Sequence, residues 1–320
     1  MVCHNCEANA KKNGKDKKGS QRFRCVPCNR TFTEYQDKPL ERMTLPTEKA
    51  AMVVSMLLEG MSIRSVQRLT GVEKRTILKL IGVAGAKADR LLNDKIKALT
   101  VRDVQADELW GFVGMKMRTK KRKVLTTPVS DELGDCYTFV ALETHSKLVL
   151  AYHIGTRDAT NTIAFTEKLN EATKGHFQLS TDAWSSYMEA VHYSLGSRID
   201  YAQLTKIYDN PKEGKRTSGK YSPSKFIKAI PTPIFGNPDM ERLCTSHIER
   251  LNLTIRMSLR RLTRLTNAFS KKLANMKYMA ALFFAFYNFC RPHRSLDGAT
   301  PAMAHGIAKT FWSVEDLLRY

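Results

Sequence analysis

The spacing of hydrophobic residues divides the chain into a helical first part and a later part that mixes strands with helices. Apolar residues recur at helical spacing over residues 47–60 and 62–80. From about residue 101, the pattern predicts strands over Val104–Val113, Cys136–Glu143, Leu148–Gly155 and His176–Thr181, and helices over Ala159–Thr173, Ser246–Phe269 and Lys271–Phe289. Residues 209–238 are rich in Pro, Gly, Lys and Ser, which predicts a loop-like insertion. This order of elements predicts an α/β fold, with a mixed sheet flanked by helices.

The charge of the chain indicates the class of its partner. Lys and Arg number 52 against 31 Asp and Glu, which leaves a net charge of +21 and a pI near 9.7. This excess favours a nucleic acid, because each neutralised phosphate releases counterions, although a ribosomal or chromatin protein would also fit. No apolar run reaches the roughly 18 residues that a membrane span needs, and the first residues lack an apolar signal core. We therefore expect a cytoplasmic protein with no membrane partner.

Four of the seven cysteines form two closely spaced pairs near the start of the chain. The pair Cys3 and Cys6 is separated from the pair Cys25 and Cys28 by 18 residues, a spacing typical of a zinc site. Each pair supplies two thiolates from one tight turn, and two turns complete a tetrahedron around Zn²⁺. Alternating residues around the second pair indicate a zinc ribbon. The alternative is two disulfides or a set of redox thiols, which a reducing compartment disfavours.

Residues 62–80 have the pattern of a helix-turn-helix. Ser62 is a suitable N-cap for a first helix, and Gly71 fits the tight turn before a second one. In this motif the start of the second helix enters the major groove of DNA. The candidate DNA-contacting residues are Lys74, Arg75, Thr76 and Lys79. An ordinary helical hairpin is the alternative.

Three acidic residues are candidates for a catalytic metal site. Asp107 lies within a predicted strand, and Asp182 comes directly after another. The carboxyl ends of neighbouring strands are where open sheets bind their ligands. Glu249 lies near the start of the long predicted helix at 246–269. Carboxylates of this kind hold pairs of divalent ions, about 3.5–4 Å apart, that activate water or a 3′-hydroxyl for phosphodiester chemistry.

The predicted helix that begins near Glu249 has a cationic side. At about 100° per residue, Arg256, Arg260 and Arg264 fall within about 60° of Glu249, while the leucines at 251, 259 and 262 fall on the other side. Between residues 251 and 296 the chain has nine Lys or Arg and no acid. This pattern predicts a metal ligand beside a track for phosphates. The alternative is a carboxylate that only stabilises a helix N-terminus.

Other acids compete for these roles. Strand alternation points Glu108 to the face opposite Asp107, and Asp103 would lie roughly 13 Å away along the same strand. Asp239 and Glu241 would replace the helical acid if the helix began earlier.

Several further residues have two interpretations each. The run Lys116–Lys123 holds six Lys or Arg and is either a solvated hairpin or a contact to the DNA backbone. Trp110 and Trp184 follow their acids closely, and we expect core packing, with stacking on a flipped base as the alternative. His247 either contacts a phosphate or has a packing or solvent role, and we expect the second.

The segments around the three acids resemble the catalytic blocks of DDE transposases, and most closely those of the insertion sequence one elements of bacteria and archaea. The blocks are Ala106–Gly114, Thr181–Trp184 and Ile248–Leu253. The resemblance continues through residues 260–271 and 288–302, with the cysteine pairs and the helix-turn-helix in front. Each block alone is weakly specific, but together they cover nearly the whole chain in the order of the family.

This resemblance implies a ribonuclease-H-like core in which Asp107 and Asp182 lie on adjacent strands and Glu249 on the following helix. It implies two Mg²⁺ ions at these acids, with Mn²⁺ as a substitute, besides Zn²⁺ at the four cysteines. The implied domains are a zinc ribbon over 1–38, a helix-turn-helix domain over 44–98, a catalytic domain over 100–296 with the insertion at about 209–238, and a C-terminal tail over 297–320.

The function implied by the resemblance is that of a DNA transposase. Such an enzyme binds the terminal repeats of an insertion element, cleaves at its ends and joins the freed 3′-hydroxyl to target DNA by in-line phosphoryl transfer. Its partners would be double-stranded DNA and further copies of the chain, at the nucleoid of a prokaryotic cell. The alternatives are a catalytically silent DNA-binding regulator derived from a transposase and a simple nuclease.

Overall fold

The structure is a computed structural model that describes residues 1–3, 5–17, 19–33, 40–41, 43–208 and 225–320. The chain forms two compact units, Met1–Arg42 and Met43–Tyr320. No helix in the described part of the chain is long and apolar enough to cross a membrane.

The first unit is a small antiparallel sheet in the order β1-β2-β3. Its strands are β1 (Lys11–Lys15), β2 (Gln21–Cys25) and β3 (Arg30–Thr33). Phe23 and Phe32 pair across β2 and β3, and their rings stack with centroids 6.0 Å apart. The two strands around the second cysteine pair follow the predicted alternation, and the polar Lys-rich spacer contributes the third.

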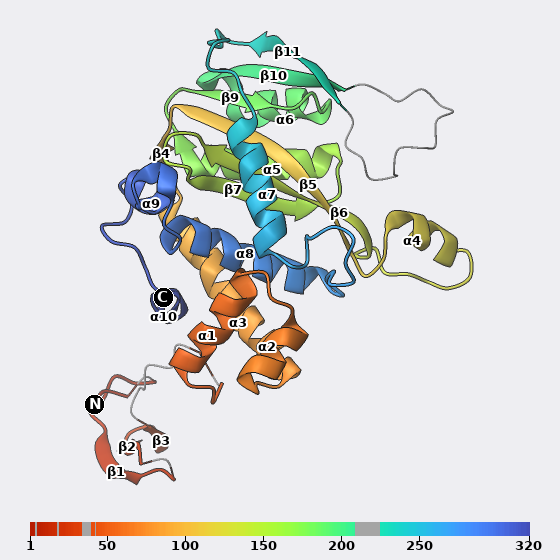
Figure 1. Ribbon diagram of the computed structural model, residues 1–320. Helices are drawn as coiled ribbons and strands as arrows, with labels where there is room; N and C mark the ends of the chain where they lie inside the picture. The colour runs from red at the N-terminus through yellow and green to blue at the C-terminus, as the bar shows by residue number, and fades with distance from the viewer. Residues whose placement is uncertain (4, 18, 34–39, 42, 209–224) are drawn as a thin grey trace. The chain divides into compact units, whose positions relative to one another are not determined.

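The second unit is built around a six-stranded mixed sheet in the order β11-β10-β9-β5-β6-β7 (Figure 1). Strands β10, β9 and β5 are parallel, and the remaining neighbours are antiparallel. The strands are β5 (Asp103–Val113), β6 (Gly134–Glu143), β7 (Val149–Gly155), β9 (Phe177–Thr181), β10 (Ile199–Tyr208) and β11 (Phe226–Phe235), and the short strands β4 (Leu99–Thr100) and β8 (Thr173–Lys174) form a separate pair.

Helices lie on both faces of this sheet, which confirms the expected fold class of a mixed α/β sheet flanked by helices. Helix α5 packs on β7 and on α6, while α7 crosses β5 and β6 from the other side (Figure 1). The helices are α1 (Thr47–Leu58), α2 (Ile63–Thr70), α3 (Lys74–Lys95), α4 (Met117–Lys123), α5 (Ala159–Ala172), α6 (Ser186–Leu195), α7 (Ser246–Ser258), α8 (Leu273–Phe289), α9 (Pro301–Ala304) and α10 (Val314–Arg319), with 3-10 turns η1 (Gly196–Arg198) and η2 (Arg294–Leu296).

Helix α8 joins the helical first part of this unit to the sheet. On one side it packs along α3, where Gly85 permits a close approach: a Cβ added to this glycine would lie 2.5 Å from Cβ of Tyr278. At its other end, the buried Asn288 exchanges two hydrogen bonds of 2.9 Å with the backbone N–H and C=O of Val149 in β7. The C-terminal helix α10 packs on α1 and α3. Packing therefore joins the helical first part of this unit to the sheet among its described residues, and the division into domains near residue 99 stays a prediction about the chain.

The predicted helix over 246–269 is wrong in its extent, because α7 ends at Ser258. The hydroxyl of Thr263 donates to the carbonyl of Arg256 at 2.7 Å, and the guanidinium of Arg256 donates to the carbonyl of Leu262 at 2.9 Å. These bonds satisfy backbone groups near the helix end and turn the chain back. Leu259 and Leu262 keep their apolar role, since both are buried, but they act from a loop.

The predicted loop-like insertion at 209–238 also needs correction. Residues 209–224 lie outside the described residues, but Phe226–Phe235 forms β11, which pairs antiparallel with β10. Pro231 and Pro233 lie within this strand, and proline in a sequence argues against a strand. Prolines within sheets occur on edge strands such as β11, because one side of an edge strand needs no ladder hydrogen bonds. The basic run 116–123 likewise forms a helix, α4, between β5 and β6.

Candidate functional site

The three predicted acids line one cavity of about 600 Å³ in the second unit. The residues around it come from strand β5, the ends of β9 and β10, and the start of α7, and include Asp107, Arg157, Asp182, Trp184, Lys206, Thr245 and Glu249. The long-range convergence on which the sequence argument depends is therefore present in the structure.

Strand register explains why Asp107 and Asp182 meet. In the parallel pair β5–β9, Gln105 lies opposite Ser180. Asp107 and Asp182 each follow two residues later, so they stand at the same level of adjacent strands. Strand β9 ends at Thr181, which leaves the sheet open beside Asp107.

Gln105 places the third acid by anchoring the start of α7. Its side-chain carbonyl accepts hydrogen bonds from the backbone N–H groups of His247 and Ile248, both at 3.0 Å. These are N–H groups in the first turn, which have no partner inside the helix. Glu249 follows in the same turn, where the hydroxyl of Thr245 donates to its carboxylate at 2.6 Å and Lys206 forms an ion pair with it.

Short hydrogen bonds hold the two aspartates in place. One oxygen of Asp107 accepts from the backbone N–H of Glu108 at 2.8 Å, and the other accepts from the side-chain amide of Asn252 at 2.7 Å. Asp182 accepts from the backbone N–H of Trp184 at 3.0 Å. Asn252 lies three residues after Glu249, so the two share a face of α7; that spacing is a signal the sequence analysis missed.

Glu108 lies close to the two aspartates although it points to the other face of β5. Its side chain is 2% exposed, and its carboxylate lies within 4.8 Å of those of Asp107 and Asp182. Glu108 does not line the cavity of the three acids, as strand alternation predicts, but its carboxylate still lies close to those of Asp107 and Asp182.

A single arginine bridges two of these acids. Arg157, which follows β7, contacts Glu108 at 2.9 Å and Asp182 at 3.3 Å. Its guanidinium also lies over the ring of Trp184, 4.1 Å from the centroid. Trp184 thus contacts a cation in this structure. No motif in the sequence indicated a role for Arg157.

Burial and mutual repulsion shift the titration of the cluster. Burial raises the pKa of Asp107 to about 6, and the charges of Asp182 and Glu249 add to this effect. Burial also raises the pKa of Glu108 to about 7, again with a contribution from Asp182. Carboxylates held this close disfavour one another's charge, and a bound cation would relieve the repulsion.

The carboxylate cluster suits Mg²⁺ in its chemistry. Asp107, Glu108 and Asp182 each offer an oxygen within 4.8 Å of the others, and hard oxygen ligands are those that Mg²⁺ prefers. Glu249 reaches the same cavity from α7.

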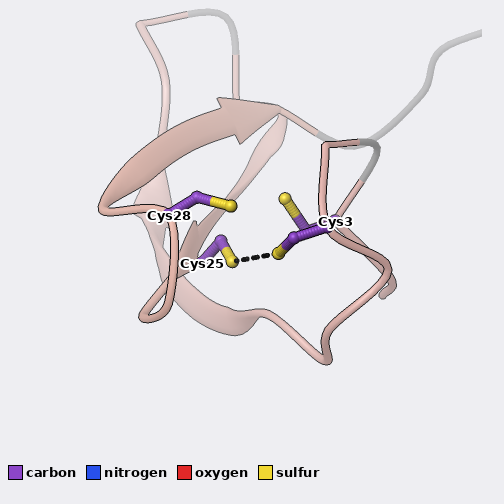
Figure 2. Close-up of side chains that lie close together, drawn as sticks. Cys3, Cys25 and Cys28 are labelled. Carbon is purple, nitrogen blue, oxygen red and sulfur yellow. Dashed lines mark hydrogen bonds between the residues drawn. The ribbon is translucent and has the colours of Figure 1, made fainter.

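The four cysteines suit Zn²⁺ equally well. Their sulfurs all lie within 4.8 Å of one another, and those of Cys6 and Cys25 are 3.4 Å apart. Figure 2 shows the side chains of Cys3, Cys25 and Cys28 turned toward one another. A hydrogen bond from the backbone of Asn5 lowers the pKa of the Cys3 thiol to about 7, whereas a hydrogen bond with Cys28 raises the pKa of the Cys6 thiol to about 12, so Cys3 loses its proton more readily than Cys6.

The competing acids have structural partners elsewhere. Asp103 accepts from Arg242 at 2.9 Å and contacts His145 at 3.0 Å. Asp239 forms an ion pair with Arg242 at 2.8 Å, ahead of the first turn of α7. Neither lines the cavity of the three acids.

The candidate DNA-contacting residues fall into two groups. Lys74, Arg75 and Lys79 are exposed near the start of α3, Thr76 is half-buried there, and Gly71 makes the preceding turn with φ of 69°. Arg260 and Arg264 are exposed in the loop after α7. Arg256 differs, because its guanidinium donates to the carbonyls of Leu262 and Trp110. DNA contact stays a prediction for all seven residues.

In comparisons with known proteins, no family model and no curated protein matches the chain. Among solved structures, the chain is similar to a piggyBac transposase in a synaptic complex with hairpin DNA, with a TM-score of 0.40 and 10% sequence identity. The match covers 87% of this chain and 72% of that chain.

Proposed function

We propose that this protein is a DNA transposase of the DDE type, similar to those of insertion sequence one elements. The zinc ribbon and the helix-turn-helix would bind the terminal repeats of the element, and Asp107, Asp182 and Glu249 would hold two Mg²⁺ ions for cleavage and strand transfer. The convergence of these three carboxylates on one cavity is the observation that carries the proposal.

The chain's own residues have separable tasks in this reaction. Bound Mg²⁺ would polarise the scissile phosphate and activate the attacking water or 3′-hydroxyl. The amide of Asn252 keeps one oxygen of Asp107 oriented, and Thr245 does the same for Glu249. Lys206 and Arg157 place positive charge at the cavity, which favours entry of an anionic phosphodiester. The protein contributes positioning and charge neutralisation rather than a covalent intermediate.

The test is cleavage of labelled DNA that carries the ends of the element. We expect wild-type protein with Mg²⁺ to nick these ends, and Asp107→Asn, Asp182→Asn and Glu249→Gln each to lower the rate roughly a thousandfold, because several kcal/mol of charge stabilisation are lost. Asp239→Asn is the matched control, since this acid lies outside the cavity. Equal cleavage by wild type and the three variants would refute the assignment.

Two further outcomes separate the alternatives. Joining of the cut 3′-end to a second DNA molecule distinguishes a transposase from a simple nuclease. Specific binding of the ends without any Mg²⁺-dependent cutting would instead indicate a DNA-binding regulator. Sedimentation of the DNA complex would report whether several copies assemble on it, as we expect for a protein that brings two ends together.

A further inference from the structure

A second cavity, of about 680 Å³, lies between the first three helices of the second unit and the segment that follows α7. We name residues 259–272 the arginine segment. The cavity has an apolar floor that includes Leu57, Leu78 and Met279. Its cations are Arg64, Lys74, Arg260, Arg261 and Lys271, and among the described residues no acid lines it. The helix-turn-helix and the arginine segment therefore line the same cavity, although they are far apart in the sequence.

Arg261 is the most unusual of these cations. One nitrogen of its guanidinium donates to the hydroxyl of Ser270 at 2.9 Å, but Nη2 is buried and has no hydrogen-bond partner in the part of the chain that the structure describes. Burial lowers the pKa of Arg261 to about 10, and no described carboxylate forms an ion pair with it. Nη2 is shielded from solvent, so Arg261 contributes positive charge to the cavity it lines without presenting this atom to a ligand.

The two sides of the cavity are held in a fixed relation. Gly60, at the end of α1, has φ of 82°, and a Cβ there would lie 2.5 Å from the carbonyl oxygen of Met257 in α7. The arginine segment is in turn joined to β5, since Gly114 donates its N–H to the carbonyl of Ser270 at 2.8 Å. Strand β5 carries Asp107, so the cavity, the helix-turn-helix and the acidic site form one framework.

The cationic surface continues beyond the cavity. Arg64 and Lys74 also line an open hollow with Arg68 and Gly71 at the turn between α2 and α3. Two adjoining hollows lined by cations match an extended polyanion better than a single compact anion. In helix-turn-helix proteins the first helix of the motif crosses the DNA backbone, which is the position that Arg64 of α2 would take.

We propose that this cavity binds the phosphodiester backbone of duplex DNA, with the exposed cations Arg64 and Lys271 contacting phosphates of the duplex that the start of α3 reads and the charge of Arg261 adding to the positive potential there. This inference rests on the proposed function and adds to it a physical link between end recognition and the acidic site. One DNA duplex would contact both the helix-turn-helix and the arginine segment. Because the arginine segment is joined to β5, this contact would bring the duplex close to the acidic site.

The test is the salt dependence of DNA binding by the full chain. Fluorescence anisotropy of a labelled duplex would be measured over a range of KCl for wild type and for the double variant Arg64→Gln and Lys271→Gln, both exposed positions. Losing two phosphate contacts should lower the slope of log Kd against log salt by about 1.8 and weaken binding roughly 50-fold at 0.1 M KCl. The matched control, Lys174→Gln with Lys309→Gln, removes two exposed charges elsewhere and should leave the slope unchanged.

The outcomes separate this inference from the proposed function. A double variant that behaves like the control, while wild type binds and cuts DNA, overturns the cavity as a DNA site and leaves the transposase proposal standing. If wild type binds DNA but never cuts it, the proposed catalysis fails, and the slopes still decide the cavity. Loss of self-association with an unchanged slope would show that a second copy of the chain occupies the cavity, which also overturns the inference.

Discussion

The ion pair between Arg157 and Glu108 gives a sharp test of how the acidic site is built. The carboxylate of Glu108 is 2% exposed and lies 2.9 Å from the guanidinium of Arg157, which is 30% exposed. Replacing Arg157 by Met leaves a buried carboxylate without its cation. Breaking a buried pair in this way costs about 3–5 kcal/mol. We expect up to about 3 kcal/mol for Arg157→Met at about pH 9, two units above the pKa of about 7 of Glu108, because protonating the unpaired carboxylate there costs about 1.4 kcal/mol per pH unit.

A double-mutant cycle isolates the interaction from other effects of the substitution. Urea unfolding would be measured at about pH 9, where Glu108 is ionised, for wild type, Arg157→Met, Glu108→Gln and the double variant. If the pair is coupled, the double variant should be less destabilised than the sum of the single variants by at least about 1 kcal/mol. The control is Arg102→Met, since Arg102 is 67% exposed and its contact with Asp103 is 3.6 Å, so a change below about 1 kcal/mol is expected.

Strict additivity of the two single variants would refute this reasoning. It would mean that the cost of Arg157→Met comes from its stacking on Trp184, or from Asp182, and not from Glu108. Glu108 would then be available to a metal ion instead of serving as the anchor of the arginine.

Two other perturbations test the packing and the metal. Asn288→Ala leaves the N–H and the C=O of Val149 without their partner, so the free energy of unfolding should fall by about 2–6 kcal/mol, at about 1–3 kcal/mol for each unsatisfied buried group. In thermal or urea unfolding, the control Asn93→Ala, at an exposed position, should differ from wild type by less than about 0.5 kcal/mol. Chelation of zinc should unfold residues 1–42 and weaken DNA binding while the larger unit keeps its melting transition, and an unchanged circular dichroism spectrum and DNA affinity in zinc-free protein would contradict the metal assignment.

Local patterns were sufficient for most of the elements. The predicted strands Val104–Val113 and Cys136–Glu143 match β5 and β6 to within two residues, and the helix predicted over Ala159–Thr173 matches α5. In each case the apolar residues that produce the period also face the core, so propensity and burial act in the same direction. The positions of Asp107 and Asp182 at the open end of the parallel strands could be inferred for the same reason.

Local patterns failed where residues distant in sequence set the geometry. The period of leucines continues through 259 and 262, yet Thr263 and Arg256 close the helix at Ser258 with bonds that no helical period reveals. Strand β11 owes its existence to pairing with β10, which compensates for two prolines that argue against a strand.

The sequence by itself determined which short segments form strands and helices, because the formation of these elements depends mainly on neighbours within a few positions. Tertiary structure alone decided that Gln105 anchors α7, that Arg157 joins Glu108 to Asp182, and that Arg261 lines the same cavity as residues of α2 and α3. Each of these contacts depends on register and on where a strand stops. These features arise when the whole chain packs, since side chains that are neighbours in space are separated by tens of residues of sequence.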